Sequence, residues 1–192
     1  MVLFGASKSF FDPNYSVQNA GHQSYQYIST FSLWGSSSPN YEKYIKMQND
    51  PLTELYYKQV VDHNHPHKSG TFHQRYYENL HYWEGPGHPL FVILGGEGPL
   101  KHILYPYISL AVAKAFGGVT LNPEHRYYGK SFPVKNPSDH DLRKQLTPRQ
   151  AMEDFVQFIK GMQEKLGCGP KGSPTYCPVV TIGGSYPVRP RL

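Results

Sequence analysis

The stretch Val179-Val180-Thr181-Ile182-Gly183-Gly184-Ser185-Tyr186 decides how the chain is expected to fold. Its first four residues are β-branched, and such side chains favour a buried, pleated strand. A short apolar run of this kind also fits a buried helix segment. The two glycines that follow favour the strand, because they permit a tight turn with close approach of the backbone. The stretch therefore predicts a strand that delivers Ser185 onto a sharp turn.

A serine on a sharp turn after a strand is the arrangement called a nucleophile elbow. Its hydroxyl stands clear of the sheet, where a histidine can accept its proton. The sequence departs from the usual pattern at Pro187, where a glycine is expected, and Pro190 follows soon after. Two prolines in so short a stretch argue against the long helix that normally continues from such a serine. The expected nucleophile is thus followed by an unusual sequence.

The composition is that of an ordinary globular domain. The chain has 192 residues, of which 39% are hydrophobic, and this is enough for one domain with its own core. The formal net charge is +5, but the lysines and arginines are scattered, so we expect no nucleic-acid partner. No apolar run approaches about 18 residues, which predicts no membrane span. No signal peptide is readable at the N-terminus, and nothing in the composition indicates an oligomeric state.

Residues 1–50 differ from the rest of the chain. They are rich in serine, asparagine, tyrosine and glutamine, and residues 35–40 read as a loop or linker. We expect a poorly ordered N-terminal extension with a short helix near residues 41–48. Residues 51–187 are then expected to form the folded part of the chain.

The folded part is predicted to begin with two antiparallel strands, residues 55–62 and 71–77, around a polar turn. His63, His65 and His67 lie in this turn and invite a metal-site interpretation. Pro66 interrupts the array, and no acid or thiol completes it nearby. We therefore expect a solvated loop and predict no metal and no cofactor.

A glycine-rich loop follows the next predicted strand. Leu90–Leu94 are five consecutive apolar residues, typical of a strand buried on both faces. The loop Gly95-Gly96-Glu97-Gly98-Pro99 comes directly after it. Glycines in this position free backbone N–H groups to face a ligand, and in a hydrolase such a loop supplies an oxyanion donor. The alternative is an ordinary turn, and the serine downstream favours the oxyanion loop.

Three charged residues follow the fourth predicted strand. Residues 107–116 fit an amphipathic helix, and residues 119–121 fit a strand that leads to Glu124, His125 and Arg126. Open α/β sheets place functional groups at the carboxyl ends of strands. The three residues are therefore candidates either for site support or for an ion-paired loop that stabilises the sheet. His125 is not expected to be the catalytic base, which in this design follows the nucleophile.

A second helix is predicted from Thr147 to Leu166, after a polar connection over residues 135–145. Thr147 is the expected N-cap, Pro148 the first helical residue, and Gln150 the partner that completes a capping box. Apolar side chains recur at helical spacing and are expected to face the core. They are Met152, Phe155, Val156, Ile159, Met162 and Leu166.

Two cysteines flank a loop rich in turn-forming residues after this helix. Cys168 and Cys177 either close a small disulfide or remain free thiols. The complete order is a two-strand hairpin followed by strand, helix, strand, helix, strand and serine. The last three strands alternate with helices, which predicts an α/β fold with a parallel part and right-handed crossovers.

Six motifs together resemble the lysosomal prolyl carboxypeptidase family, which also includes dipeptidyl peptidase II and thymus-specific serine protease. The resemblance covers about residues 55–187, and it rests on the order of motifs that are each weak alone. These are Val61-Asp62-His63, Thr71-Phe72 with Gln74-Arg75-Tyr76, Gly95-Gly96-Glu97-Gly98-Pro99, Glu124-His125-Arg126-Tyr127-Tyr128-Gly129, Leu146-Thr147 with Gln150-Ala151, and Gly183-Gly184-Ser185-Tyr186.

The resemblance implies the N-terminal half of an α/β-hydrolase that acts as a serine exopeptidase. Its substrates would be peptides, commonly cleaved beside proline, in lysosomes or vacuoles or outside the cell. Ser185 matches the nucleophile. The backbone N–H of Tyr186 matches one oxyanion donor, and the loop around Gly96 and Glu97 matches the other.

The family's aspartate, histidine and helical cap lie downstream of every position present here, so we expect an inactive fragment. Residues 188–192 depart from the family and are expected to be an aberrant tail. One alternative is a non-catalytic truncated product or partner-binding fragment. Another is a lipase-type esterase of the same fold, which is disfavoured because the His-Gly motif that lipases commonly carry is absent before Gly95.

Overall fold

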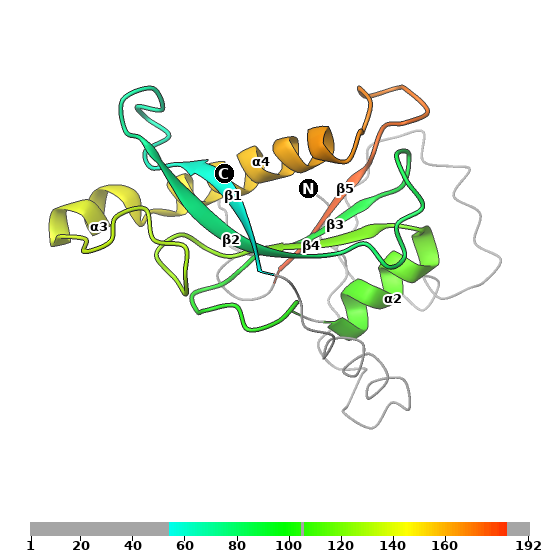
Figure 1. The fold of residues 1–192 in the computed structure, drawn as a ribbon, viewed down its shortest axis with the longest axis horizontal. Helices are drawn as coiled ribbons and strands as arrows, with labels where there is room; N and C mark the ends of the chain where they lie inside the picture. The colour runs from blue at the N-terminus through cyan, green and yellow to red at the C-terminus, as the bar shows by residue number, and fades with distance from the viewer. Residues whose placement is uncertain (1–53, 105, 184–192) are drawn as a thin grey trace.

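The computed structural model describes residues 54–104 and 106–183, and it contains one mixed sheet between helices (Figure 1). Helix α4 covers one face of the sheet, and α2 lies on the opposite side. The strands are β1 (Leu55–Val60), β2 (Thr71–Asn79), β3 (Leu90–Ile93), β4 (Val119–Pro123) and β5 (Val179–Ile182). The helices are α2 (Pro106–Phe116), α3 (Asp139–Gln145) and α4 (Pro148–Lys165).

The strand order in the sheet is β1-β2-β4-β3-β5. Strands β1 and β2 form an antiparallel hairpin, and β2 pairs antiparallel with β4. Strand β3 pairs parallel with both β4 and β5. This arrangement confirms the predicted α/β fold, with a hairpin followed by alternating parallel strands and helices.

The sheet separates two apolar clusters. The larger one lies between the sheet and α4, where Leu90, Val92 and Leu121 meet Phe158 and Met162. The smaller one, on the other face, joins Tyr77 and Ile93 to the loop residues Leu100 and Ile103. Leu90, Val92 and Ile93 are all fully buried, as expected for a central strand with helices on both sides.

Helix α3 corrects one prediction, because it lies within the expected polar connection. Ser138 caps it: its hydroxyl accepts a hydrogen bond from Asp141 N, and the Asp141 carboxylate accepts one from Ser138 N. This reciprocal pair satisfies backbone donors that the first turn leaves unpaired. The helix has little apolar periodicity, since Leu142 is its only large aliphatic residue, so hydrophobic spacing could not reveal it.

Helix α4 begins as predicted, but its capping interactions and its buried face differ from the prediction. Thr147 is the N-cap and accepts from Gln150 N at 3.3 Å. The predicted capping box was wrong, because the Gln150 side chain turns away and accepts a hydrogen bond from His63 N. Val156 is 41% exposed and is not a core residue, whereas Phe158 is fully buried and was not predicted. The buried face of α4 is therefore displaced from the predicted one.

A disulfide joins Cys168 and Cys177 in the loop between α4 and β5. Their Cα atoms are 5.5 Å apart, a usual separation for this bond. Cys177 is fully buried in the larger apolar cluster, so the disulfide ties the loop to the start of β5.

Several predictions fall on residues outside the described ranges. They are the N-terminal extension of residues 1–50, the helix near residues 41–48, the tail of residues 188–192, and the positions Ser185 and Tyr186. Within the described ranges, no helix is both long and apolar enough to cross a membrane.

Candidate functional site

The glycine-rich loop of the predicted site begins where the carboxyl ends of β3 and β5 lie side by side. The two strands run parallel, with Ile93 opposite Ile182, and Leu94 N donates to Ile182 O at 2.8 Å. The chain therefore leaves β5 beside the start of the glycine-rich loop. Ser185 and Tyr186 follow shortly after Gly183 and lie beyond the described residues.

Two backbone amides of the glycine-rich loop are not used within the described part of the chain. Gly95 N donates to Pro123 O at 3.1 Å, and Gly98 N donates to Gly96 O at 2.9 Å. No hydrogen bond among the described residues uses the N–H of Gly96 or of Glu97. These are the two residues of this loop that were predicted to be oxyanion donors.

Gly95 occupies a place where only glycine fits. A Cβ atom there would lie 2.6 Å from Pro123 O and 3.0 Å from His125 N, both of them backbone atoms. Backbone atoms cannot move aside as the end of a flexible side chain can. The loop thus starts in close contact with the end of β4.

Glu124 is a fully buried carboxylate that holds the neighbouring loops together. It accepts hydrogen bonds from Leu100 N at 2.9 Å, Lys130 N at 2.9 Å and Ser131 Oγ at 2.7 Å. It also forms an ion pair with Arg75. The carboxylate is thus surrounded by donors, the environment that a buried charge requires.

His125 is buried among aromatic rings. Its Nδ1 donates to Arg126 O at 2.7 Å, and its ring meets Tyr128 and Phe155 edge-on, with centroids 5.2 and 6.3 Å away. Burial lowers the pKa of this imidazole, which favours the neutral form. The surroundings of His125 are those of a packed, hydrogen-bonded side chain.

Arg126 is fully buried and makes a bidentate pair with Asp154 of α4. Its Nε donates to Asp154 Oδ2 at 2.6 Å, and its Nη2 donates to Asp154 Oδ1 at 2.7 Å. The guanidinium also donates to the carbonyl oxygens of Val60, Val61 and Gln145. Arg126 therefore connects the hairpin, the end of β4 and the start of α4.

The model of the family described as serine carboxypeptidase S28 matches residues 59–189. The chain belongs to the serine carboxypeptidase S28 family. Its members are serine peptidases with an α/β-hydrolase fold, which agrees with the sheet described above.

Individual relatives support the same family. This S28 chain is 41% identical over 113 residues to a probable serine protease of Arabidopsis thaliana. The aligned region covers 59% of the chain and 23% of the relative. It is 36% identical over 140 residues to a putative serine protease of Caenorhabditis elegans, with 71% and 26% covered. It is 34% identical over 135 residues to human lysosomal Pro-X carboxypeptidase, with 69% and 26% covered. The S28 chain thus spans about a quarter of the length of these relatives.

The histidine-rich turn of the S28 chain is only partly the solvated loop that was predicted. His63 Nε2 lies 2.7 Å from Asp154 Oδ1, and its side chain is 13% exposed. His65 is exposed but contacts the buried Asp62 through Nδ1 at 3.1 Å. Among the described residues, no cluster of histidine, cysteine, aspartate or glutamate could hold a metal ion.

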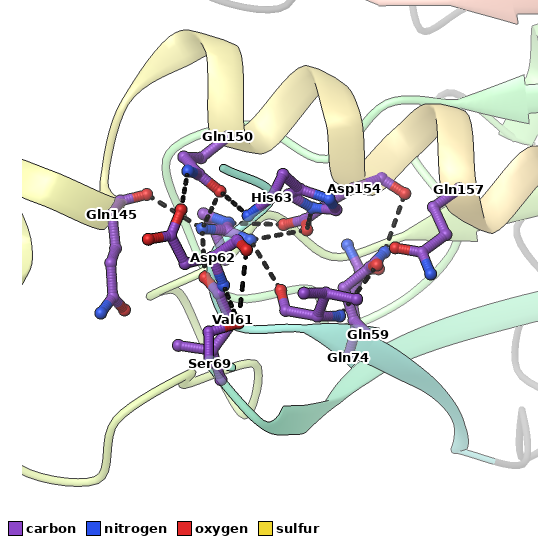
Figure 2. A network of polar contacts seen from close by, with 12 residues as sticks. Gln59, Val61, Asp62, His63, Ser69, Gln74, Gln145, Gln150, Asp154 and Gln157 are labelled. Atoms are coloured by element: carbon purple, nitrogen blue, oxygen red, sulfur yellow. Dashed lines mark hydrogen bonds and ion pairs between the residues drawn. The ribbon is translucent and has the colours of Figure 1, made fainter. Parts of the chain in front are cut away.

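Asp62 anchors this turn to α4 of the S28 chain (Figure 2). Its Oδ1 accepts from Gln150 Nε2 at 2.7 Å and from Asn64 N at 2.9 Å. Burial alone would raise the pKa of Asp62, but the hydrogen bonds from Asn64, His65, Gln150 and Lys144 lower it well below its ordinary value. Asp62 therefore stays ionised in acidic solution.

Sequence reasoning missed two charged residues of this S28 network, Arg75 and Asp154. Arg75 was noted only as part of a motif, although it is a buried residue of β2. Asp154 lies one turn after Gln150 and one turn before Phe158, on the buried face of α4. Gln150 and Asp154 are polar, four residues apart, and on the same helix face as the core residue Phe158. This spacing is the signal that could have revealed Asp154.

Proposed function

We propose that this chain carries the nucleophile and part of the oxyanion hole of a serine exopeptidase. Ser185 is the nucleophile, and the N–H groups of Gly96, Glu97 and Tyr186 are the oxyanion donors. The observation that supports this most directly is the parallel pairing of β3 with β5. It brings the loop, with two amides that form no hydrogen bond to any described residue, beside the strand that leads to Ser185.

The reaction is an acyl transfer to serine. Ser185 Oγ attacks the carbonyl carbon of the peptide bond while a histidine takes the hydroxyl proton. The carbonyl oxygen becomes negatively charged and accepts hydrogen bonds from the loop amides. The amine leaves with the proton from the histidine, and water then hydrolyses the acyl-enzyme. Each well-placed oxyanion donor contributes roughly 10²- to 10³-fold to the rate in such enzymes.

We further propose substrates that contain proline near the cleaved bond. S28 membership implies peptide substrates, and one relative is named Pro-X carboxypeptidase. The same relative is named lysosomal, and the disulfide between Cys168 and Cys177 is of the kind that persists in oxidising compartments. The proposed location is accordingly the lysosome or vacuole, or the outside of the cell.

The 192 residues alone are proposed to be inactive. No histidine, aspartate or glutamate follows Ser185 in this sequence, so the elements that normally activate the serine from downstream are not among these residues. Loss of triad members costs on the order of 10⁴- to 10⁶-fold in rate. Purified chain should release no detectable fluorophore from a fluorogenic prolyl peptide.

A chimera tests the proposal directly. In it, residues 59–187 of this chain replace the matching segment of human lysosomal Pro-X carboxypeptidase, and the unmodified human enzyme serves as the reference. We expect hydrolysis of a prolyl peptide that Ser185→Ala abolishes. A folded chimera without activity, or with activity that survives Ser185→Ala, would contradict the assignment.

A further inference from the structure

We propose that Glu124 and Arg75 are a positioning pair that sets the conformation of the oxyanion loop before substrate binds. We call this pair, with its contacts to Leu100, the clamp. The inference rests on the proposed function, because the clamp serves catalysis only if the amides of Gly96 and Glu97 are oxyanion donors. Neither side chain needs to touch the substrate. Both act through Leu100, the residue with which the loop returns to the body of the protein.

Leu100 is held through both of its backbone polar groups. Its N–H donates to Glu124 Oε1 at 2.9 Å, and its carbonyl oxygen accepts from Arg75 Nη2 at 2.7 Å. The two side chains also pair with each other. The Glu124 side chain is fully buried and that of Arg75 is 6% exposed, so these are charge-assisted hydrogen bonds away from water, which are among the stronger ones in proteins.

The same end of β4 holds the loop on either side of Leu100. Before it, Gly95 N donates to Pro123 O. After it, Asn122 joins the two flanks: its Oδ1 accepts from Leu104 N at 2.8 Å, and its Nδ2 donates to Ile93 O at 2.7 Å. Residues 96–99 lie between Gly95 and Leu100, and they include the two amides that are not hydrogen-bonded within the described part of the chain.

Glu124 is itself fixed by the turn that follows it. Ser131 Oγ and Lys130 N occupy its second oxygen, and Ser131 Oγ also accepts from Arg75 N at 2.9 Å. Gly129 has a φ of +56°, and a Cβ atom there would overlap Glu124 Oε1. The turn after Glu124 thus packs closely around the carboxylate and supplies donors to it.

A clamp of this kind matters because oxyanion donors work when their positions are set in advance. Donors that must reorganise during the reaction lose much of their effect. Small displacements of a site by residues that never contact the substrate can lower the rate by about 100-fold. Glu124 and Arg75 are placed to prevent such displacement by fixing the end of the loop.

Hydrogen exchange measured by mass spectrometry on the 192-residue chain tests the clamp without any activity. Glu124→Gln keeps the shape but removes the charge, so the amides of residues 95–104 should exchange about 10-fold faster or more. Exchange in α4 should stay unchanged. Glu54→Gln is the matched control, because Glu54 pairs with Arg75 Nη1 at 2.9 Å. Its other hydrogen bonds among the described residues go to Tyr56 and Lys130 and not to the loop. This variant should leave exchange in the loop unchanged.

Two results of that experiment would overturn the proposal. One is a loop whose exchange does not change in Glu124→Gln. The other is exchange that accelerates equally in α4, which would show that Glu124 serves the whole fold rather than the loop.

Kinetics of the chimera give a second reading. Glu124→Gln should lower kcat about 10- to 100-fold and leave KM nearly unchanged, because the loop acts on the developing oxyanion. Glu54→Gln should retain kcat, and an equal loss in this control would overturn the proposal. Should the chimera show no Ser185-dependent turnover at all, the proposed function fails, while hydrogen exchange still decides whether the clamp exists.

Discussion

Arg126 and Asp154 form two parallel hydrogen bonds, from Nε to Oδ2 at 2.6 Å and from Nη2 to Oδ1 at 2.7 Å. Neither side chain is more than 1% exposed. The pair joins the end of β4 to the second turn of α4, and His63 contacts the same carboxylate. This ion pair therefore holds α4 against the sheet. Through His63 it also holds the turn between β1 and β2 against α4.

Replacing Asp154 should therefore cost much of the stability. Asp154→Asn leaves the buried Arg126 without its charged partner, and breaking such pairs costs about 3–5 kcal/mol. Urea unfolding measures the loss. Lys130→Gln is the control, because the Lys130–Glu54 pair is screened by water and its loss should change the stability little. Equal losses in the two variants would contradict this assignment.

Two glycines of the same loop should respond differently to alanine. At Gly95 a methyl group would meet the backbone of Pro123 and His125, and we expect a loss of about 1–3 kcal/mol in unfolding free energy. At Gly98 no atom lies within 4 Å, so the change should stay within about 0.5 kcal/mol. Thermal unfolding of the two variants side by side checks this. A tolerant Gly95 would mean that the loop does not start against β4.

Opening the disulfide should destabilise the chain and loosen the start of β5. Cys168→Ser with Cys177→Ser removes a cross-link over a short loop, which contributes roughly 2–3 kcal/mol. The double variant should unfold at lower urea concentration, and a reducing agent should lower the stability of the wild type but not of the variant. A wild type that does not respond to reductant would contradict the prediction.

Asp62 should stabilise the fold at neutral and mildly acidic pH and lose this contribution in strong acid. Its pKa is lowered in the folded state, so its contribution is complete above the unfolded value of about 3.9 and is lost only as pH falls toward the lower folded value. The stability difference between wild type and Asp62→Asn should stay constant from about pH 7 to pH 5 and shrink below about pH 4. Urea unfolding across this range measures it. A difference that stays constant below about pH 4 would show that the folded pKa is not lowered, because equal folded and unfolded pKa values give no pH dependence.

The sheet could be read from the sequence because its strands are marked by local composition. Leu90–Leu94 is a continuous apolar run that ends in glycines, and β5 is a run of β-branched residues. Helix α3 could not be read in this way, since a capping pair rather than an apolar stripe defines it. Thr147 was identifiable as an N-cap because its signal also lies within a few residues.

The glycine-rich loop of the site was predictable, but the residues that hold it were not. Its glycines directly follow a continuous apolar run, which is a signal within the local sequence. Arg75 and Glu124 are 49 positions apart, and Arg126 and Asp154 are 28 apart. Only the folded sheet brings each pair together, so no local spacing encodes their contact. The motif around Glu124 indicated that these residues matter, but the structure was needed to show what each one contacts.

The position of β5 also has a consequence for how the chain assembles. Leu90 of β3 faces Val179 of β5, 89 positions later, while the hairpin of β1 and β2 joins residues only 11 to 21 positions apart. Contacts between distant residues form slowly, because a long loop must close before they are gained. During synthesis the other four strands leave the ribosome before β5. The strand that leads to Ser185 is therefore expected to dock late, onto a sheet whose outer edge already exists.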